Sequence, residues 1–267
     1  MRSQDARKSA RCVILALLAG ATPAAALAQD AMRGLDMTSP DMTMAEMTRA
    51  DVAAALAGAP GGHGADLSGK RLSGLDLSGL DFSGVAFHAA RLNHSNLSRA
   101  KLDGAVLDQV WALEVNLTAA SLVKASLFGT QLQGARLDGA DLSGARVTAD
   151  LTGAHLAGAR FVGADCSADE KNQSMGLMHA AFKSADLTGA DFSGAKLARA
   201  DLRYSKLGGA NFAGASLREA DASGADLRGA RLEGADASGL DLNSARIDAS
   251  AAPIFTGAAN LKRAFAE

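Results

Sequence analysis

Large apolar side chains recur at every fifth residue along most of this chain. The series is unbroken over residues 67–147, restarts one residue early for 151–166, and resumes over 182–247. A helix repeats every 3.6 residues and a strand every two, so neither keeps such side chains on one side at a period of five. The pattern therefore predicts a chain that turns once in every five-residue unit.

Each unit divides into inward and outward positions. In Ala140-Asp141-Leu142-Ser143-Gly144 the alanine and leucine would point inward, while the aspartate and the Ser-Gly pair would face water. Internal repeats of this kind indicate a solenoid, in which neighbouring units stack to bury a continuous core. The Ala-Asp-Leu-x-x units over about residues 65–250 resemble the pentapeptide-repeat family. The resemblance implies an all-β fold, a right-handed quadrilateral β-helix (a solenoid of pentapeptide repeats) with four units per coil.

Four units per coil would give about nine coils, a rod on the order of 40 Å long at the usual strand separation. Counting units by face then places Phe82, Phe161, Phe192 and Phe212 in one column. The column would continue across the break between Cys166 and Phe182, where the chain has more residues than a unit needs. We therefore predict a loop insertion at about 168–179 that consumes no face.

The two ends of a stacked solenoid expose unpaired strands and need caps. Thr48-Arg49-Ala50-Asp51 has the pattern of a helix start, so residues 48–58 are predicted to form a capping helix. Residues 251–267 are predicted to form a second cap, an amphipathic helix that begins after Pro253. The family resemblance leaves a homodimer through this C-terminal segment as an alternative to a simple cap.

The first residues are typical of an export signal. Basic residues precede a short apolar run, and Ala26-Leu27-Ala28 supplies a small-x-small cleavage site. The run is shorter than the ~20 residues that cross a bilayer, so no membrane span is expected after cleavage of residues 1–28. The mature protein would be periplasmic or secreted. It would keep only Cys166, which excludes an intramolecular disulfide.

Charge and composition disfavour several functions. The chain carries 27 basic and 29 acidic residues, a formal charge of −2, so no strong field attracts nucleic acid. The resemblance implies DNA mimicry as an alternative function, because quinolone-resistance members of the family resemble duplex DNA and bind gyrase, a topoisomerase. A mimic needs a continuous acidic stripe. Here Asp81 and Asp191 are offset on their face by Lys124 and Arg160, so this alternative is disfavoured.

Catalysis is not expected. The five histidines are dispersed, and no nucleophile-base pairing or recurring metal-ligand spacing is present. We therefore predict a protein that is not an enzyme and has no cofactor.

A methionine-rich segment, residues 29–47, suggests a second alternative. Thioethers are soft ligands suited to Cu(I) or Ag(I), so a periplasmic metal-binding protein would use them. The candidate ligands are Met42, Met44, Met47, Met175, Met178 and His179. The competing interpretation is a flexible linker.

One group of apolar residues falls in outward positions. Trp111 occupies a slot normally filled by Asp or Asn, and four other apolar residues stand near it in the predicted register. The candidate protein-binding residues are Trp111, Leu113, Val106, Val123 and Phe128. Exposed apolar patches often mark interaction sites, although surface apolar residues can also be scattered. The sequence thus predicts an exported, non-catalytic protein-binding or structural scaffold whose protein partner is unknown.

Overall fold

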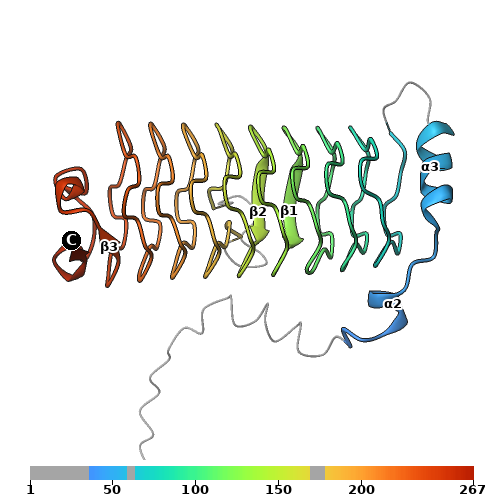
Figure 1. The fold of residues 1–267 in the computed structure, drawn as a ribbon, viewed down its shortest axis with the longest axis horizontal. Helices are drawn as coiled ribbons and strands as arrows, with labels where there is room; N and C mark the ends of the chain where they lie inside the picture. The colour runs from blue at the N-terminus through green and yellow to red at the C-terminus, as the bar shows by residue number, and fades with distance from the viewer. Residues whose placement is uncertain (1–35, 59–63, 169–177) are drawn as a thin grey trace, which may run out of the picture. The chain divides into compact units, whose positions relative to one another are not determined.

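The computed structural model describes residues 36–58, 64–168 and 178–267, and within them the chain winds into stacked coils (Figure 1). Backbone bridges join residues one coil apart in parallel, as in Asp66↔Ala86 and Lys101↔Ser121. Their separation of twenty residues is four five-residue units. The structure therefore confirms a four-sided β-solenoid, in which most pairs are single bridges rather than long strands.

Among the described residues, longer elements occur at only a few places. The helices are α2 (Pro40–Thr43) and α3 (Arg49–Gly58), the strands are β1 (Ser126–Gln131), β2 (Arg146–Asp150), β3 (Arg246–Ile247) and β4 (Phe265–Ala266), and the 3-10 turns are η2 (Ala249–Ala251) and η3 (Leu261–Arg263). β1 pairs with β2 and β3 with β4, both in parallel. No helix among the described residues combines the length and the hydropathy needed to cross a membrane.

A unit in the middle of the rod bonds both neighbouring coils and closes one corner. The Leu142 N–H donates to the Arg160 carbonyl in the next coil at 2.7 Å, and the Ala145 N–H closes the corner on the Leu142 carbonyl at 3.0 Å. The corner needs a residue with positive φ, and Gly144 supplies it at 66° without a steric penalty. Glycine is the commonest residue at this corner, although residues such as Arg99 adopt the same backbone conformation, with a φ of 58°.

The core is built from the predicted alanines, leucines and phenylalanines. Leu142 and Ala140 are fully buried. The rings of Phe161 and Phe192 stack at 4.7 Å between centroids, and Phe192 stacks on Phe212 at 5.2 Å. The first contact spans the break between Cys166 and Phe182, and the second lies after it. Both confirm that these three phenylalanines share a column, as predicted.

Two length changes leave the faces in register. A missing residue shortens the spacing to nineteen, as in Arg136↔His155, and the coil that follows is longer by eleven residues, as in His155↔Asp186. The extra residues leave the ladder between Asp165 and Ala181. The insertion therefore consumes no face, as predicted, although its residues 169–177 lie outside the described ones.

The N-terminal end of the stack is covered by α3, at the opposite end from the C-terminus (Figure 1). The Thr48 N–H donates to the Asp51 carboxylate at 2.8 Å, and the Asp51 N–H donates to the Thr48 hydroxyl at 3.2 Å. This is the reciprocal bonding expected at a helix start. Val52 then anchors the helix, because its side chain is fully buried against the core.

The C-terminal cap is not the amphipathic helix predicted from the apolar spacing. After Pro253 the chain makes turns and η3, and β4 then pairs with β3 in register Arg246↔Phe265. The physical reason is the exposed edge of the last coil, whose backbone groups need hydrogen-bond partners. β4 supplies them to β3, and the preceding turns supply the carbonyls of Gly257 and Ala259. Phe255 is buried, while Ile254 and Phe265 are exposed.

Candidate interaction surfaces

Residues 36–47, here called the N-terminal strap, pack against the solenoid. Met42 is only 4% exposed. The buried Asn93 side chain donates to the Met42 carbonyl at 3.1 Å and accepts the Leu113 N–H at 3.0 Å. The strap was predicted as part of a linker, but a single amide joins it to two coils.

Charge pairs add to this attachment. Arg71 contacts Asp41 at 2.8 Å and Glu46 at 3.6 Å, and Lys70 contacts Glu46 at 3.4 Å. Desolvation acts to raise the pKa of Glu46, yet the charges of Lys70 and Arg71 hold that pKa below its ordinary value. The strap thus neutralises the basic start of the face that carries Arg71.

The five candidate protein-binding residues are all half-buried. They occupy neighbouring faces of the third and fourth coils: Val106, Trp111, Leu113, Val123 and Phe128. The Arg146 guanidinium lies 5.7 Å from the centre of the Phe128 ring. Leu113 adjoins the strap through Asn93. The group is therefore a set of partly covered apolar side chains spread over three successive faces.

The described candidate metal ligands are spread over several coils. The strap holds Met42, Met44 and Met47 near the first two coils, with Met44 exposed and Met47 packed on the core. The Met178 methyl lies beside Gly129 in the fourth coil. Met175 lies outside the described residues. Among residues that the structure describes, no three His, Cys, Asp or Glu side chains form a metal-binding group.

His179 and Cys166 lie in different surroundings. The charge of His179 helps to lower the pKa of Asp201 in the seventh coil. This position is away from the strap methionines. Burial raises the pKa of the Cys166 thiol far above its ordinary value, and the nearby Asp165 adds to the shift. A thiol that stays protonated in the core is a poor nucleophile.

Outward charges pair between coils on most columns. Lys206 contacts Asp186 at 3.1 Å, and Arg160 contacts Asp141 at 3.2 Å. One column differs, because Asp201, Asp221 and Asp241 stack directly on one another. Arg203 compensates part of this column, donating to both Asp201 oxygens at 2.8 and 2.6 Å.

Sequence reasoning missed Tyr204. This side chain is 61% exposed at a corner where most units have glycine, and its φ is 57°. Its ring covers Gly224 so closely that a Cβ there would stand 2.6 Å from it. An aromatic residue in the fifth position of a unit was the available signal.

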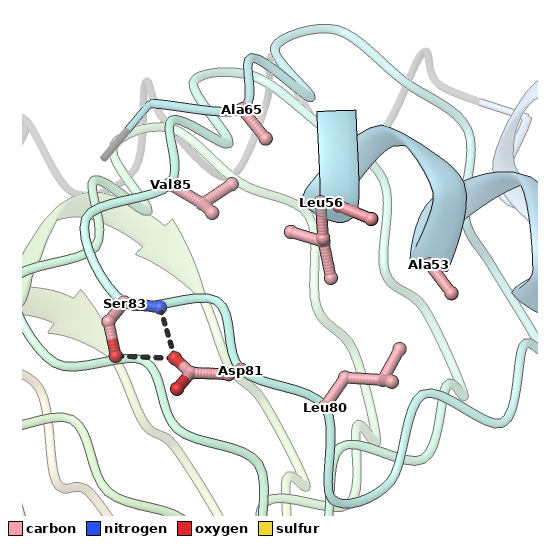
Figure 2. A pocket seen from close by; sticks show the side chains of 8 residues that line it. Ala53, Leu56, Ala65, Leu80, Asp81, Ser83 and Val85 are labelled. Atoms are coloured by element: carbon pink, nitrogen blue, oxygen red, sulfur yellow. Dashed lines mark hydrogen bonds between the residues drawn. The ribbon is translucent and has the colours of Figure 1, made fainter. Parts of the chain in front are cut away.

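A hollow of about 440 Å³ separates α3 from the first coils (Figure 2). Its lining is mostly small and apolar: Ala53, Leu56, Ala57, Ala65, Leu80 and Val85, with Asp81 and Ser83. Figure 2 shows Leu56 projecting from the helix into this space, with Leu80 and Val85 on the other side. Both Ser83 donors, N–H and hydroxyl, bond the Asp81 carboxylate.

A stacked, four-sided β-solenoid of five-residue units defines a class of repeat protein, and comparison with known families names it. The family model for pentapeptide repeats matches residues 63–93, 81–111, 114–148, 177–214, 195–234 and 210–247. The chain belongs to the pentapeptide-repeat family.

The QnrB1 structure agrees on the fold. A trypsin-treated form of QnrB1, a plasmid-mediated fluoroquinolone resistance protein, is 19% identical with a TM-score of 0.50, covering 69% of this chain and 84% of that one. HetL, involved in heterocyst differentiation regulation in the cyanobacterium Nostoc sp. strain PCC 7120, is 26% identical with a TM-score of 0.46, covering 74% and 98%. A search of curated proteins found no match.

Proposed function

We propose that this protein, as a right-handed β-helix, is an exported, non-catalytic module that binds another protein or serves as a structural scaffold. The observation that supports it most is the continuous ladder, which fixes outward side chains in columns one coil apart. Rigid repeat surfaces of this kind are suited to binding and offer no enclosed site for chemistry. The signal-like residues 1–28 support a periplasmic or secreted location.

The proposed partner is a protein rather than a nucleic acid. Ion pairs such as Lys206–Asp186 neutralise outward basic residues, which disfavours binding to phosphates. The same pairs interrupt most acidic columns, and Arg203 compensates part of the column of Asp201 and Asp221, which disfavours DNA mimicry. Trp111 and its apolar neighbours are the proposed contact on the faces of the rod. A homodimer through the C-terminal segment is an additional proposal, supported by the exposed side chains of Ile254 and of Phe265 in β4.

A capture experiment tests the Trp111 surface. The full chain is immobilised and exposed to periplasmic extract, and captured proteins are identified and titrated. Because interface tryptophans cost about 2 kcal/mol or more when truncated, Trp111→Ala should weaken capture more than tenfold with an unchanged melting temperature. Tyr204→Ala, which removes an exposed aromatic residue elsewhere, is the control and should capture normally. Equal capture by both variants would exclude the Trp111 surface, and no specific capture would exclude protein binding.

A further inference from the structure

The N-terminal strap buries polar side chains on one face of the first two coils. Ser73 and Asn93 hold equivalent outward positions on this face, yet they are only 3% and 2% exposed. Further along the same face the equivalent residues, Leu113 and Gln133, are half-buried. The Asn93 side chain donates to the Met42 carbonyl of the strap at 3.1 Å. The burial of these two polar residues is therefore due to the strap.

The strap satisfies only part of the hydrogen-bonding capacity of this face. The Arg71 guanidinium contacts the Asp41 carboxylate at 2.8 Å. Arg91 pairs with Arg71 in the ladder and carries a second guanidinium on the same column. In the described part of the chain, the buried Arg91 Nε and the buried Ser73 hydroxyl have no hydrogen-bond partner. Buried donors without acceptors cost stability, so this face offers more donors than its present cover can use.

The contacts that hold the strap are of a kind that another segment could replace. The Arg71–Asp41 and Lys70–Glu46 pairs are solvent-exposed, and exposed ion pairs contribute little to stability. Met42 is the one buried residue of the strap. A segment held by one buried side chain and by exposed charges can be displaced by a segment that also satisfies the unused donors.

We propose that the face beneath the strap binds an acidic segment of a partner protein, and that the strap is an internal competitor that this segment displaces. The strap face is defined by the outward residues Arg71, Ser73, Arg91 and Asn93. Charge complementarity identifies the partner chemistry, because the strap presents Asp41 and Glu46 to this basic start of the face. A partner segment with one more carboxylate would also accept hydrogen bonds from Arg91 and Ser73.

The strap face is continuous with the proposed Trp111 surface. Arg91 pairs with Trp111 in the ladder, and Asn93 accepts the Leu113 N–H at 3.0 Å. A partner that contacts Trp111 would therefore meet the strap on the adjacent coil. The inference rests on the proposed protein-binding function and adds both the chemistry of the partner segment and a means of regulating its access.

The probe is a synthetic, fluorescein-labelled peptide with the sequence of residues 36–47, and its affinity for the full chain is measured by fluorescence anisotropy. In a release variant with Asp41→Lys and Glu46→Lys, the basic face repels the internal strap. This variant should bind the peptide about tenfold or more tightly than the unaltered chain, in which the strap competes at high effective concentration. Asp36→Lys is the charge control, since Asp36 bonds Thr38 within the strap, and should bind like the unaltered chain.

Met42→Ser is a second release variant, which removes the buried side chain of the strap and leaves the strap face unaltered. It should bind the peptide more tightly by a similar factor. Circular dichroism should show the same melting temperature for the coils in both release variants and in the unaltered chain. Agreement between the two variants separates release of the strap from any local effect of the added lysines.

An acidic scan of the peptide tests for the carboxylate that the strap lacks. Each peptide residue is replaced in turn by Asp or Glu. At least one replacement should tighten binding to the release variant about tenfold, because a carboxylate forms a charge-assisted hydrogen bond with Arg91. The gain should be lost when Arg91→Gln is added to the release variant. Arg99→Gln, at an exposed corner after another face, is the matched control and should keep the gain.

The inference is overturned if the peptide binds no chain, if it binds the unaltered and release variants equally, if no acidic replacement tightens binding, or if the gain survives Arg91→Gln. Light scattering tests the other occupant. A dimer of the unaltered chain that both release variants lose would make a second copy the occupant and overturn the partner segment. The peptide assay contains no extract, so its failure removes this inference alone, whereas absence of specific capture removes the protein-binding function.

Discussion

At the scale of the residue, position within the five-residue unit decides what a side chain does. Asp141 and Leu142 are adjacent, yet the leucine is fully buried and the aspartate bonds the Ser143 N–H at 2.9 Å on the surface. Asn96 makes the same bond to Ser98 at 3.1 Å without a charge. Where the outward slot holds an acceptor, that acceptor bonds the turn with or without a charge, whereas Trp111 shows that the slot also takes a residue that has none.

Leu142→Asp should unfold the middle of the rod. It places a carboxylate between coils with no partner, which costs about 4 kcal/mol or more of the free energy of unfolding. Thermal melting followed by circular dichroism checks it. Asp141→Asn is the matched control and should change stability by less than about 1 kcal/mol, because it keeps the acceptor. A Leu142→Asp variant that melts like the control would refute the inward assignment.

The period of five was enough to predict which residues are buried, because every unit has its inward and outward positions in the same order. It was not enough to predict long-range polar contacts. Arg49 reaches the carbonyls of Asp76 and Ser78 from another element, and Asn93 reaches the strap across 51 residues of sequence. Such pairings depend on how α2 and α3 dock, and the repeat pattern holds no information on that.

At the scale of the element, the ends departed most from expectation. Helix α3 begins where its Thr48–Asp51 signal predicted, since that signal is local. The apolar spacing near the C-terminus was misleading, because the demand of the β3 edge for a partner outweighs helical periodicity in a short segment. The packing of the strap was also not predicted. Met42 is buried because the strap packs on a face of the solenoid, and the local sequence around Met42 does not indicate that contact.

Asn93→Ala should release the strap without unfolding the coils. The change removes the donor to the Met42 carbonyl and the acceptor of the Leu113 N–H, at about 1–3 kcal/mol for each polar group left unsatisfied. Hydrogen exchange over residues 36–47 should become faster, with exchange in the coils unchanged. Asn243→Ala, in the same slot of the same face, is the control and should leave the strap protected. Unaltered protection in Asn93→Ala would show that the strap is held by other contacts.

At the scale of the whole molecule, repeated aspartate turns couple stability to pH. Hydrogen bonds from the Ser83 hydroxyl and N–H lower the pKa of Asp81, and the same two bonds from Thr188 lower the pKa of Asp186 against desolvation. A lowered folded-state pKa stabilises the protein above the unfolded value of about 3.9, and this stabilisation is lost as pH falls through the folded pKa.

The melting temperature should therefore be nearly constant from pH 7 to about pH 5 and fall below about pH 4. Thermal denaturation at closely spaced pH values measures it. A variant with Asp81, Asp186 and Asp226 changed to Asn should show a shallower acid dependence, because the amide keeps the turn and does not titrate. A flat melting temperature down to pH 3 in the unaltered chain would contradict the assignment.

The corner that absorbs eleven additional residues has a consequence for how such a molecule can diverge. Asp165 and Ala181 still pair with their own columns, so the faces stay aligned there. Residues added at a corner therefore leave the arrangement of the other surface residues unchanged. Loss of one whole unit is different, because every later unit would move to the next face, about a quarter turn around the rod. Each column would then continue with the residues that had belonged to the adjacent column. Insertions at corners alter the surface locally, whereas gain or loss of single units reassigns all the surfaces downstream, and only four units at a time restore them.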